Sequence, residues 1–125
     1  MKIQSFKDLF IWQKGHLFVI EIYKLTRSFP VEEKFGLVSQ IRRSSASICA
    51  NVAEGYTKST KDFARFLEIA RGSLEETKYY LILSKDLGYC SEQEFNKLFN
   101  QVDEVGRMTK SLIQKLRIKF KQDVD

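Results

Sequence analysis

The sequence predicts an all-α protein with the architecture of an antiparallel, up-down-up-down four-helix bundle. Apolar residues recur three and four positions apart along four long segments, the spacing that places them on one face of a helix. The 125 residues include only one proline and six glycines. Because these are the residues that most often break helices, their scarcity favours long helices with short connections. Four such helices pack as consecutive antiparallel neighbours. We expect a single domain over residues 1–125, with helices at about residues 6–28, 35–54, 61–87 and 92–120.

The first helix, residues 6–28, should follow an N-cap at Ser5. It carries two apolar stripes about 130° apart. The stripes are Leu9, Trp12, Val19, Ile20 and Tyr23 on one side, and Ile11, Phe18, Ile22 and Leu25 on the other. A small bundle covers one stripe and leaves the other exposed, which is typical of an interface. We therefore expect self-association, and we assign the second stripe to an oligomer interface. The alternative is that neighbouring helices of the same chain cover both stripes.

The second helix, residues 35–54, is poor in bulky side chains around Ser44 and Ser45, and Gly55 is expected to cap its C-terminus. A polar stripe also runs along it, formed by Gln40, Arg43, Ser47 and Glu54. This combination predicts a helix that is packed on more than one side. Because buried charge needs a partner, Arg43 and Glu54 should each meet one on another helix or subunit, and we add both to the oligomer interface.

The third and fourth helices have clear boundaries. Gly72 lies in the middle of the third helix, where we expect it to permit close approach by a neighbouring helix. Gly88 should end that helix as its C-cap. Ser91 and Glu94 form the pattern of a capping box at the start of the fourth helix.

The residue inventory argues against several classes of protein. No catalytic arrangement of Ser, Cys, His and Asp and no phosphate-binding loop is present, so we expect no enzyme activity. His16 is the only histidine, and Cys49 and Cys90 are the only cysteines, so we expect two free thiols, no metal and no cofactor. No apolar run is long enough for a membrane span, and the N-terminus is charged where a signal peptide would be apolar. We therefore expect a cytoplasmic protein that does not engage a membrane.

The chain carries 21 Lys plus Arg against 16 Asp plus Glu, a net charge of +5. Two groups of basic residues stand out, one around the connection between helices two and three and one near the end of helix four. The group near the end of helix four also includes Lys110 and Lys121. The residues that we select are Arg42, Arg43, Lys58, Lys61 and Arg65 from the first group, and Lys115, Arg117 and Lys119 from the second. Several cations on one surface bind phosphates without sequence preference, so we consider these residues candidates for binding RNA or DNA. The alternatives are a solvated basic face and a scaffold that binds another protein.

The chain resembles the bacterial "four helix bundle protein" family, also called 23S rRNA intervening-sequence proteins. The resemblance extends from Phe6 to about Leu116 and rests on several short segments taken together. They are FKDL at 6–9, WQ at 12–13, FP at 29–30, FGL at 35–37, QIRR at 40–43, SI at 47–48, ANVAEG at 50–55, Phe63, Phe66, Leu67, Ala70, GSLE at 72–75 and LGY at 87–89. Cys49 departs from the family pattern, which commonly has proline at that position.

The resemblance implies an antiparallel four-helix bundle that assembles into a homo-oligomer, a pentamer in the family. Some members are encoded within large-subunit rRNA genes. The accessory proteins of diversity-generating retroelements are similar and are thought to bind nucleic acid through basic surfaces. We therefore expect a non-catalytic protein that binds nucleic acid, with RNA favoured over DNA and a protein-interaction scaffold as the alternative.

Overall fold

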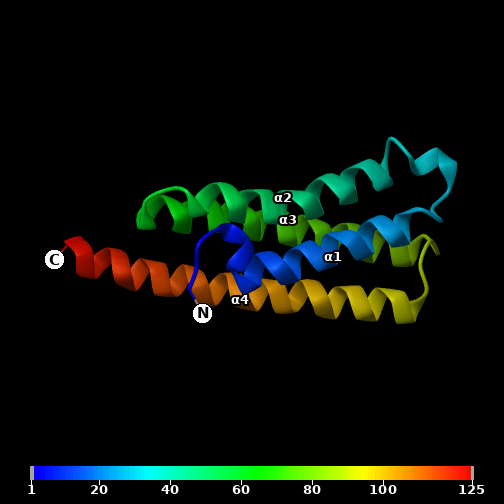
Figure 1. Cartoon of the computed structure of the whole chain (residues 1–125). Helices are drawn as coiled ribbons and strands as arrows, with labels where there is room; N and C mark the ends of the chain where they lie inside the picture. Colours follow the sequence, from blue (N-terminus) through cyan, green and yellow to red (C-terminus); the bar gives the residue numbers. More distant parts are fainter. Residues whose placement is uncertain (1, 125) are drawn as a thin grey trace.

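The computed structural model describes residues 2–124, with side chains up to residue 122, and consists of four long helices (Figure 1). The helices are α1 (Phe10–Thr26), α2 (Leu37–Tyr56), α3 (Thr60–Asp86) and α4 (Glu92–Val124). Two 3-10 turns, η1 (Phe6–Asp8) and η2 (Val31–Glu33), precede α1 and α2. No strand occurs among the described residues, and the predicted all-α class is confirmed. Within the same part of the chain, no helix combines the length and hydrophobicity needed to cross a bilayer.

Consecutive helices run in opposite directions along one long axis, as the colour gradient in Figure 1 shows. Contacts join α1 to α2, α2 to α3, α3 to α4, and α4 back to α1. Within residues 2–124, no Cα atoms of the diagonal pairs α1–α3 and α2–α4 lie within 8 Å of one another, as expected for four helices around one core. The connection between α2 and α3 therefore lies at the same end of the bundle as the last turns of α4 (Figure 1).

Local capping residues explain most of the helix boundaries. Ser59 accepts a hydrogen bond from the backbone N–H of Asp62 at the start of α3. Ser91 and Glu94 form the predicted capping box at the start of α4. Ser5 also forms a capping box, but it caps η1 rather than a long helix, because Leu9 is extended and α1 begins only at Phe10. The fourth helix continues past the predicted end near residue 120 to Val124.

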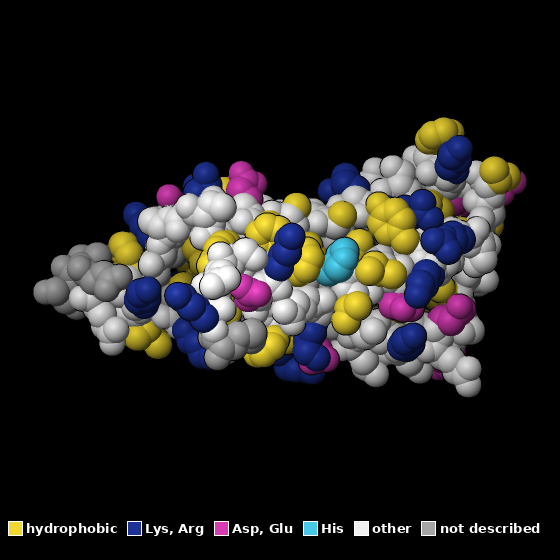
Figure 2. All heavy atoms as spheres, viewed as in Figure 1, with side chains coloured by type: hydrophobic (Ala, Val, Ile, Leu, Met, Phe, Trp, Pro, Cys, Tyr) yellow, Lys and Arg dark blue, Asp and Glu magenta, His cyan; other side chains and the backbone are white. Residues whose placement is uncertain are grey.

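The stripe of α1 that we assigned to an oligomer interface forms part of the core instead. Phe18 and Ile22 are 1% and 0% exposed, and Ile11 and Leu25 are also buried. The interface assignment of these four residues is wrong, because they join the apolar cluster at the centre of the bundle. The apolar side chains that α1 does expose are Phe10, Leu17, Ile20 and Tyr23. Figure 2 shows exposed apolar side chains across the middle of this face, over α1.

Three glycines have different roles. Gly88 has a φ of +79° and follows the last turn of α3, which confirms the predicted C-cap. Gly55 does not cap α2: it lies inside the helix, where its missing side chain leaves room for Phe66 and Phe63 of α3. Gly72 was expected to admit a neighbouring helix, but an added Cβ would meet no atom within 4 Å among the described residues. The close approach between helices therefore occurs at Gly55 and not at Gly72.

Small polar residues join α2 to α3, as the composition of the second helix predicts. Ser44 and Thr77 are both fully buried, and their hydroxyl oxygens lie 2.7 Å apart. The Thr77 hydroxyl also lies 2.8 Å from the backbone carbonyl oxygen of Ser73, and the Ser44 hydroxyl lies 3.3 Å from that of Ile41. Side chains this short let the two backbones come close while each buried hydroxyl keeps a hydrogen-bond partner.

The polar stripe of α2 has one paired end and one exposed end. Arg43 forms an ion pair with Glu76 of α3, which also accepts a hydrogen bond from Tyr80 at 2.9 Å. The expected partner for Arg43 is thus on a neighbouring helix of the same chain. Glu54 is exposed, so the expectation that it lies in a covered position is wrong for this chain on its own.

Candidate functional site

The fold brings together basic residues that are far apart in the sequence. Lys58 lies in the connection between α2 and α3, and Lys61 and Arg65 lie in the first turns of α3. Arg117 and Lys119 lie in the last turns of α4, at the same end of the bundle as the start of α3 (Figure 1). We call these five residues the basic end. They come from both groups of basic residues in the sequence, and the antiparallel order of α3 and α4 brings them to the same end of the bundle.

Charge is distributed unevenly between the two ends of the bundle. At the basic end, residues 50–68 and 114–122 include seven Lys or Arg and three Asp or Glu. At the opposite end, residues 20–42 and 80–98 include six of each sign. Figure 2 shows the two signs beside one another at that opposite end, on the right. In sequence, positions 123 and 125 add two Asp after the basic end, and their side chains lie outside the described residues.

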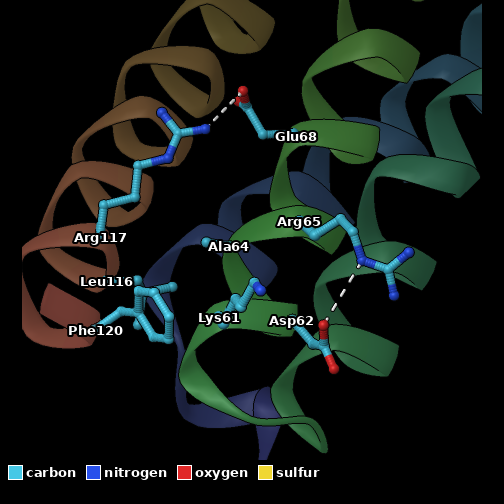
Figure 3. Close-up of a pocket in the computed structure, with 8 residues that line it drawn as sticks. All are labelled: Lys61, Asp62, Ala64, Arg65, Glu68, Leu116, Arg117 and Phe120. Carbon is cyan, nitrogen blue, oxygen red and sulfur yellow. Dashed lines mark hydrogen bonds and ion pairs between the residues drawn. The ribbon is translucent and has the colours of Figure 1, made fainter. Parts of the chain in front are cut away.

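A pocket of about 340 Å³ opens between α3 and α4 at the basic end (Figure 3). Apolar atoms from Ala64, Leu116 and Phe120 line one part of it. Lys61 and Arg117 provide cations at its rim, and the ammonium nitrogen of Lys61 lies 5.7 Å from the centre of the Phe120 ring. The pocket therefore combines an aromatic surface with nearby positive charge.

Two carboxylates hold the guanidinium groups around this pocket. Glu68 accepts hydrogen bonds from Arg71 at 2.8 Å and from Arg117 at 3.2 Å. The hydrogen bond from Arg71 is the main reason that the pKa of Glu68 lies below its usual value; partial desolvation opposes it, and the charge of Arg117 adds to it. Glu68 thus stays ionised and holds Arg117 beside the pocket. Arg65 pairs with Asp62 at 3.7 Å, and in Figure 3 its guanidinium turns away from α4.

Arg42 and Arg43, two further candidates from the sequence, do not belong to this surface. Arg43 lies 13 residues before the end of α2 at Tyr56, which is about 20 Å along the helix axis. Arg42 binds back onto α1: its Nε donates to Thr26 Oγ1 at 2.9 Å, and its guanidinium lies 4.5 Å from the centre of the Tyr23 ring. Both arginines therefore lie away from the basic end, and their guanidinium groups contact α3 and α1 of the same chain. We remove these two residues from the candidate nucleic-acid surface.

Lys115 lies near the basic end but lines a different groove. That groove, of about 440 Å³, runs between the start of α1 and α4 and includes Phe10, Arg107 and Met108. Lys115 therefore belongs to a neighbouring face and not to the pocket between α3 and α4.

Phe120 and Leu116 were not predicted as site residues from the sequence. The two are four positions apart, so they share one face of α4 and continue its core stripe beyond the point where α1 covers it. The sequence does contain one relevant signal: an apolar pair spaced i, i+4 among lysines near the end of a helix. This pair becomes part of a pocket only because the first turns of α3 lie beside it, and the sequence did not show that position.

Comparisons with known proteins place the chain in a family. A search of curated proteins found no match. The crystal structure of a protein of unknown function from the S23 ribosomal protein family of Bacteroides thetaiotaomicron VPI-5482 is similar. It shares 30% sequence identity at a TM-score of 0.77, over 83% of this chain and 95% of that chain. The sequence model of the 23S rRNA-intervening sequence protein family matches residues 7–111. The chain therefore belongs to the 23S rRNA-intervening sequence protein family.

Proposed function

We propose that this protein is a non-catalytic, oligomeric nucleic-acid-binding protein that contacts the phosphates of RNA through the basic end. The observation that carries the proposal is the meeting of Lys58, Lys61, Arg117 and Lys119 at one end of the bundle, while the opposite end is electrically balanced. RNA is preferred to DNA because the family is described by its relation to 23S rRNA. We place the protein in the cytoplasm, where structured RNA is available.

Phosphate binding by such a surface needs no base-specific contact. Each lysine that neutralises a phosphate releases condensed counterions, so affinity falls steeply as salt rises. A single bundle offers only a few cations and would bind weakly. An oligomer presents several copies of the basic end, and simultaneous contacts raise the overall affinity without any new kind of interaction.

The test is a salt titration of RNA binding with a charge variant and a matched control. The variant K58Q/K119Q/K121Q removes two lysines of the basic end and Lys121, which lies in the last turn of α4. All three lysines are exposed, and the residues that line the pocket stay in place. Binding of a labelled, structured RNA is followed by fluorescence anisotropy. Three lost phosphate contacts should lower the slope of log K against log salt by about 2 to 3, at about 0.7 to 0.9 for each contact.

The control K24Q/K34Q/K85Q removes the same charge from the opposite end, where all three lysines are also exposed. It should keep the wild-type slope. If both variants lose affinity equally, binding follows net charge and the basic end is not the site. If the wild-type protein does not bind RNA even at low salt, the proposal fails, and a protein-interaction scaffold becomes the better explanation.

Self-association is supported by the exposed apolar face of α1. Phe10 and Leu17 are 59% and 60% exposed and lie seven residues apart, on one side of the helix. Exposed large apolar side chains that gather on one face of a helix are typical of contacts between proteins. We expect a homo-oligomer that uses this face, with a pentamer as the assembly that the family suggests.

Sedimentation analysis of F10S/L17S tests this assembly. The variant should shift the protein toward the monomer, because it removes two apolar side chains from the proposed contact. The control V31S/F35S removes apolar side chains that are 78% and 87% exposed at the other end of the bundle, and it should leave the mass unchanged. A wild-type protein that is monomeric at all concentrations would exclude self-association. An unchanged mass in F10S/L17S would exclude this face.

A further inference from the structure

The pocket between α3 and α4 contains features that phosphate binding does not require. A surface that binds only phosphates needs cations, whereas this pocket also has an apolar part formed by Ala64, Leu116 and Phe120. Phe120 is only partly buried although it is a large aromatic residue near the end of a helix. Its ring is therefore available at the surface, within reach of the Lys61 ammonium group.

The size of the pocket limits what it can hold. At about 340 Å³ it is near the lower end of the range for small-ligand sites, about 300 to 1,000 Å³. A paired RNA helix presents its phosphates and keeps its bases stacked inside, so it has no group that fits a small apolar pocket. An unpaired nucleotide does have such a group, because its base can turn outward and stack on an aromatic side chain.

We infer that this pocket captures a single unpaired base of an RNA, with the base stacked on Phe120 and the adjoining phosphate bound by Lys61 and Arg117. This inference rests on the proposed function and gives it a substrate preference: RNA with a bulge, loop or free end rather than a continuous duplex. Ala64 keeps the pocket open, because it is the small residue on the α3 side facing the apolar residues of α4.

Charge and stacking act together in this arrangement. Lys61 already lies near the Phe120 ring and is an exposed, flexible side chain that can follow a phosphate. Arg117 is held at the rim by Glu68, so its guanidinium is positioned before RNA arrives. Base stacking on an aromatic side chain is tolerant of base identity, so the pocket should select for an unpaired base and not for a particular sequence.

The test compares three RNA duplexes of the same length by anisotropy at fixed salt. The first is fully paired, the second contains one bulged adenosine, and the third contains an abasic nucleotide at the same bulge. Wild-type protein should bind the bulged adenosine about 5- to 140-fold more tightly than the paired duplex, the range expected for one stacked base. The abasic bulge keeps the flexibility and the phosphate but should lose this preference.

The variant F120L removes the aromatic face while keeping an apolar side chain, and it should abolish the preference for the bulged adenosine. Its salt slope should match the wild type, because the cations remain. The control F35L removes a ring that is 87% exposed elsewhere and should keep the preference. A second variant, A64L, fills the pocket from the α3 side and should act like F120L while leaving the Phe120 ring in the sequence.

The outcomes separate this inference from the proposed function. Salt-dependent binding without a preference for the bulged base overturns the inference and leaves the proposed function intact. Equal binding of the adenosine and abasic bulges also overturns it, because the base then contributes nothing. A preference that survives in both F120L and A64L shows that the base is bound elsewhere. Absence of binding to all three duplexes overturns both proposals.

Discussion

Gly55 occupies the closest contact between α2 and α3, and we expect G55A to destabilise the protein even though alanine is the better helix former. A Cβ at this position would lie 2.6 Å from the Cβ of Phe66 and 2.9 Å from Cδ1 of Phe63. The Cβ of Phe66 is bonded directly to the α3 backbone, so a change of side-chain rotamer cannot move it away. The two helices would have to separate, which would loosen the packing around them.

The magnitude follows from two opposing effects. Overpacking a core costs about 1 to 3 kcal/mol, and two contacts below 3.0 Å place this site in the upper half of that range. Replacing glycine by alanine inside a helix returns about 1 kcal/mol. We therefore expect G55A to lower the free energy of unfolding by about 1 to 2 kcal/mol.

Gly72 supplies a matched control, since it is also inside a helix but an added Cβ would meet no atom within 4 Å. G72A should raise the free energy of unfolding by about 1 kcal/mol. The gain in helix propensity is common to both variants, so the difference between them isolates the steric cost, about 2 to 3 kcal/mol.

The assay is urea unfolding followed by far-UV circular dichroism, repeated at two protein concentrations. A G55A protein as stable as the wild type would refute the reasoning, because it would show that α2 and α3 absorb the added methyl group without cost. A destabilised G72A protein would contradict the control. If that loss grew with protein concentration, it would show that another copy of the chain covers Gly72.

Three further predictions concern buried or internally bound side chains. Burial raises the pKa of the Cys49 thiol to about 12. At mildly alkaline pH, iodoacetamide should therefore modify the more accessible Cys90 in the folded protein and should modify Cys49 only after unfolding. Equal labelling of the two cysteines in peptide mass spectra of the folded protein would contradict this prediction. T77V should lower the free energy of unfolding by about 1 kcal/mol, because it removes the hydroxyl that pairs with Ser44. S44A should then lower the free energy of unfolding by less in the T77V protein than in the wild type. Additive urea-unfolding results would refute that coupling. R42Q should lower the free energy of unfolding by about 1 to 2 kcal/mol, because Arg42 contacts Thr26 and Tyr23, and it should not change the affinity for RNA. If R42Q instead lost RNA affinity while its stability stayed unchanged, Arg42 would belong to the binding surface.

The helices and most of their ends were predictable because their signals are local. The capping box at Ser91 and Glu94 and the left-handed glycine at Gly88 each act within a few residues along the chain. The first helix shows the limit of this reasoning. Ser5 does form a cap, but it caps the short turn η1, because the extended backbone at Leu9 separates that turn from α1. No pattern in the sequence predicted this break.

The buried face of α1 could not be predicted from periodicity. Both of its stripes are apolar and both have helical spacing, so each satisfies the pattern for a core face equally well. Burial of Phe18 and Ile22, and exposure of Leu17, result from the direction from which α2 and α4 approach. The two glycines show the same limit, since Gly55 and Gly72 are both inside helices and differ only in what lies opposite.

The sequence by itself determined that this is a bundle of long helices with an excess of basic residues, because periodicity, capping and charge are properties of neighbouring residues. The tertiary structure alone decided that Lys61 and Arg117 share one pocket and that Arg42 does not belong to it. Lys61 and Arg117 are far apart in the chain, and they meet because α3 starts where its antiparallel neighbour α4 ends. Phe120 acquires its candidate role in the same way, since an aromatic residue near a helix end becomes a stacking surface only when another helix places cations beside it.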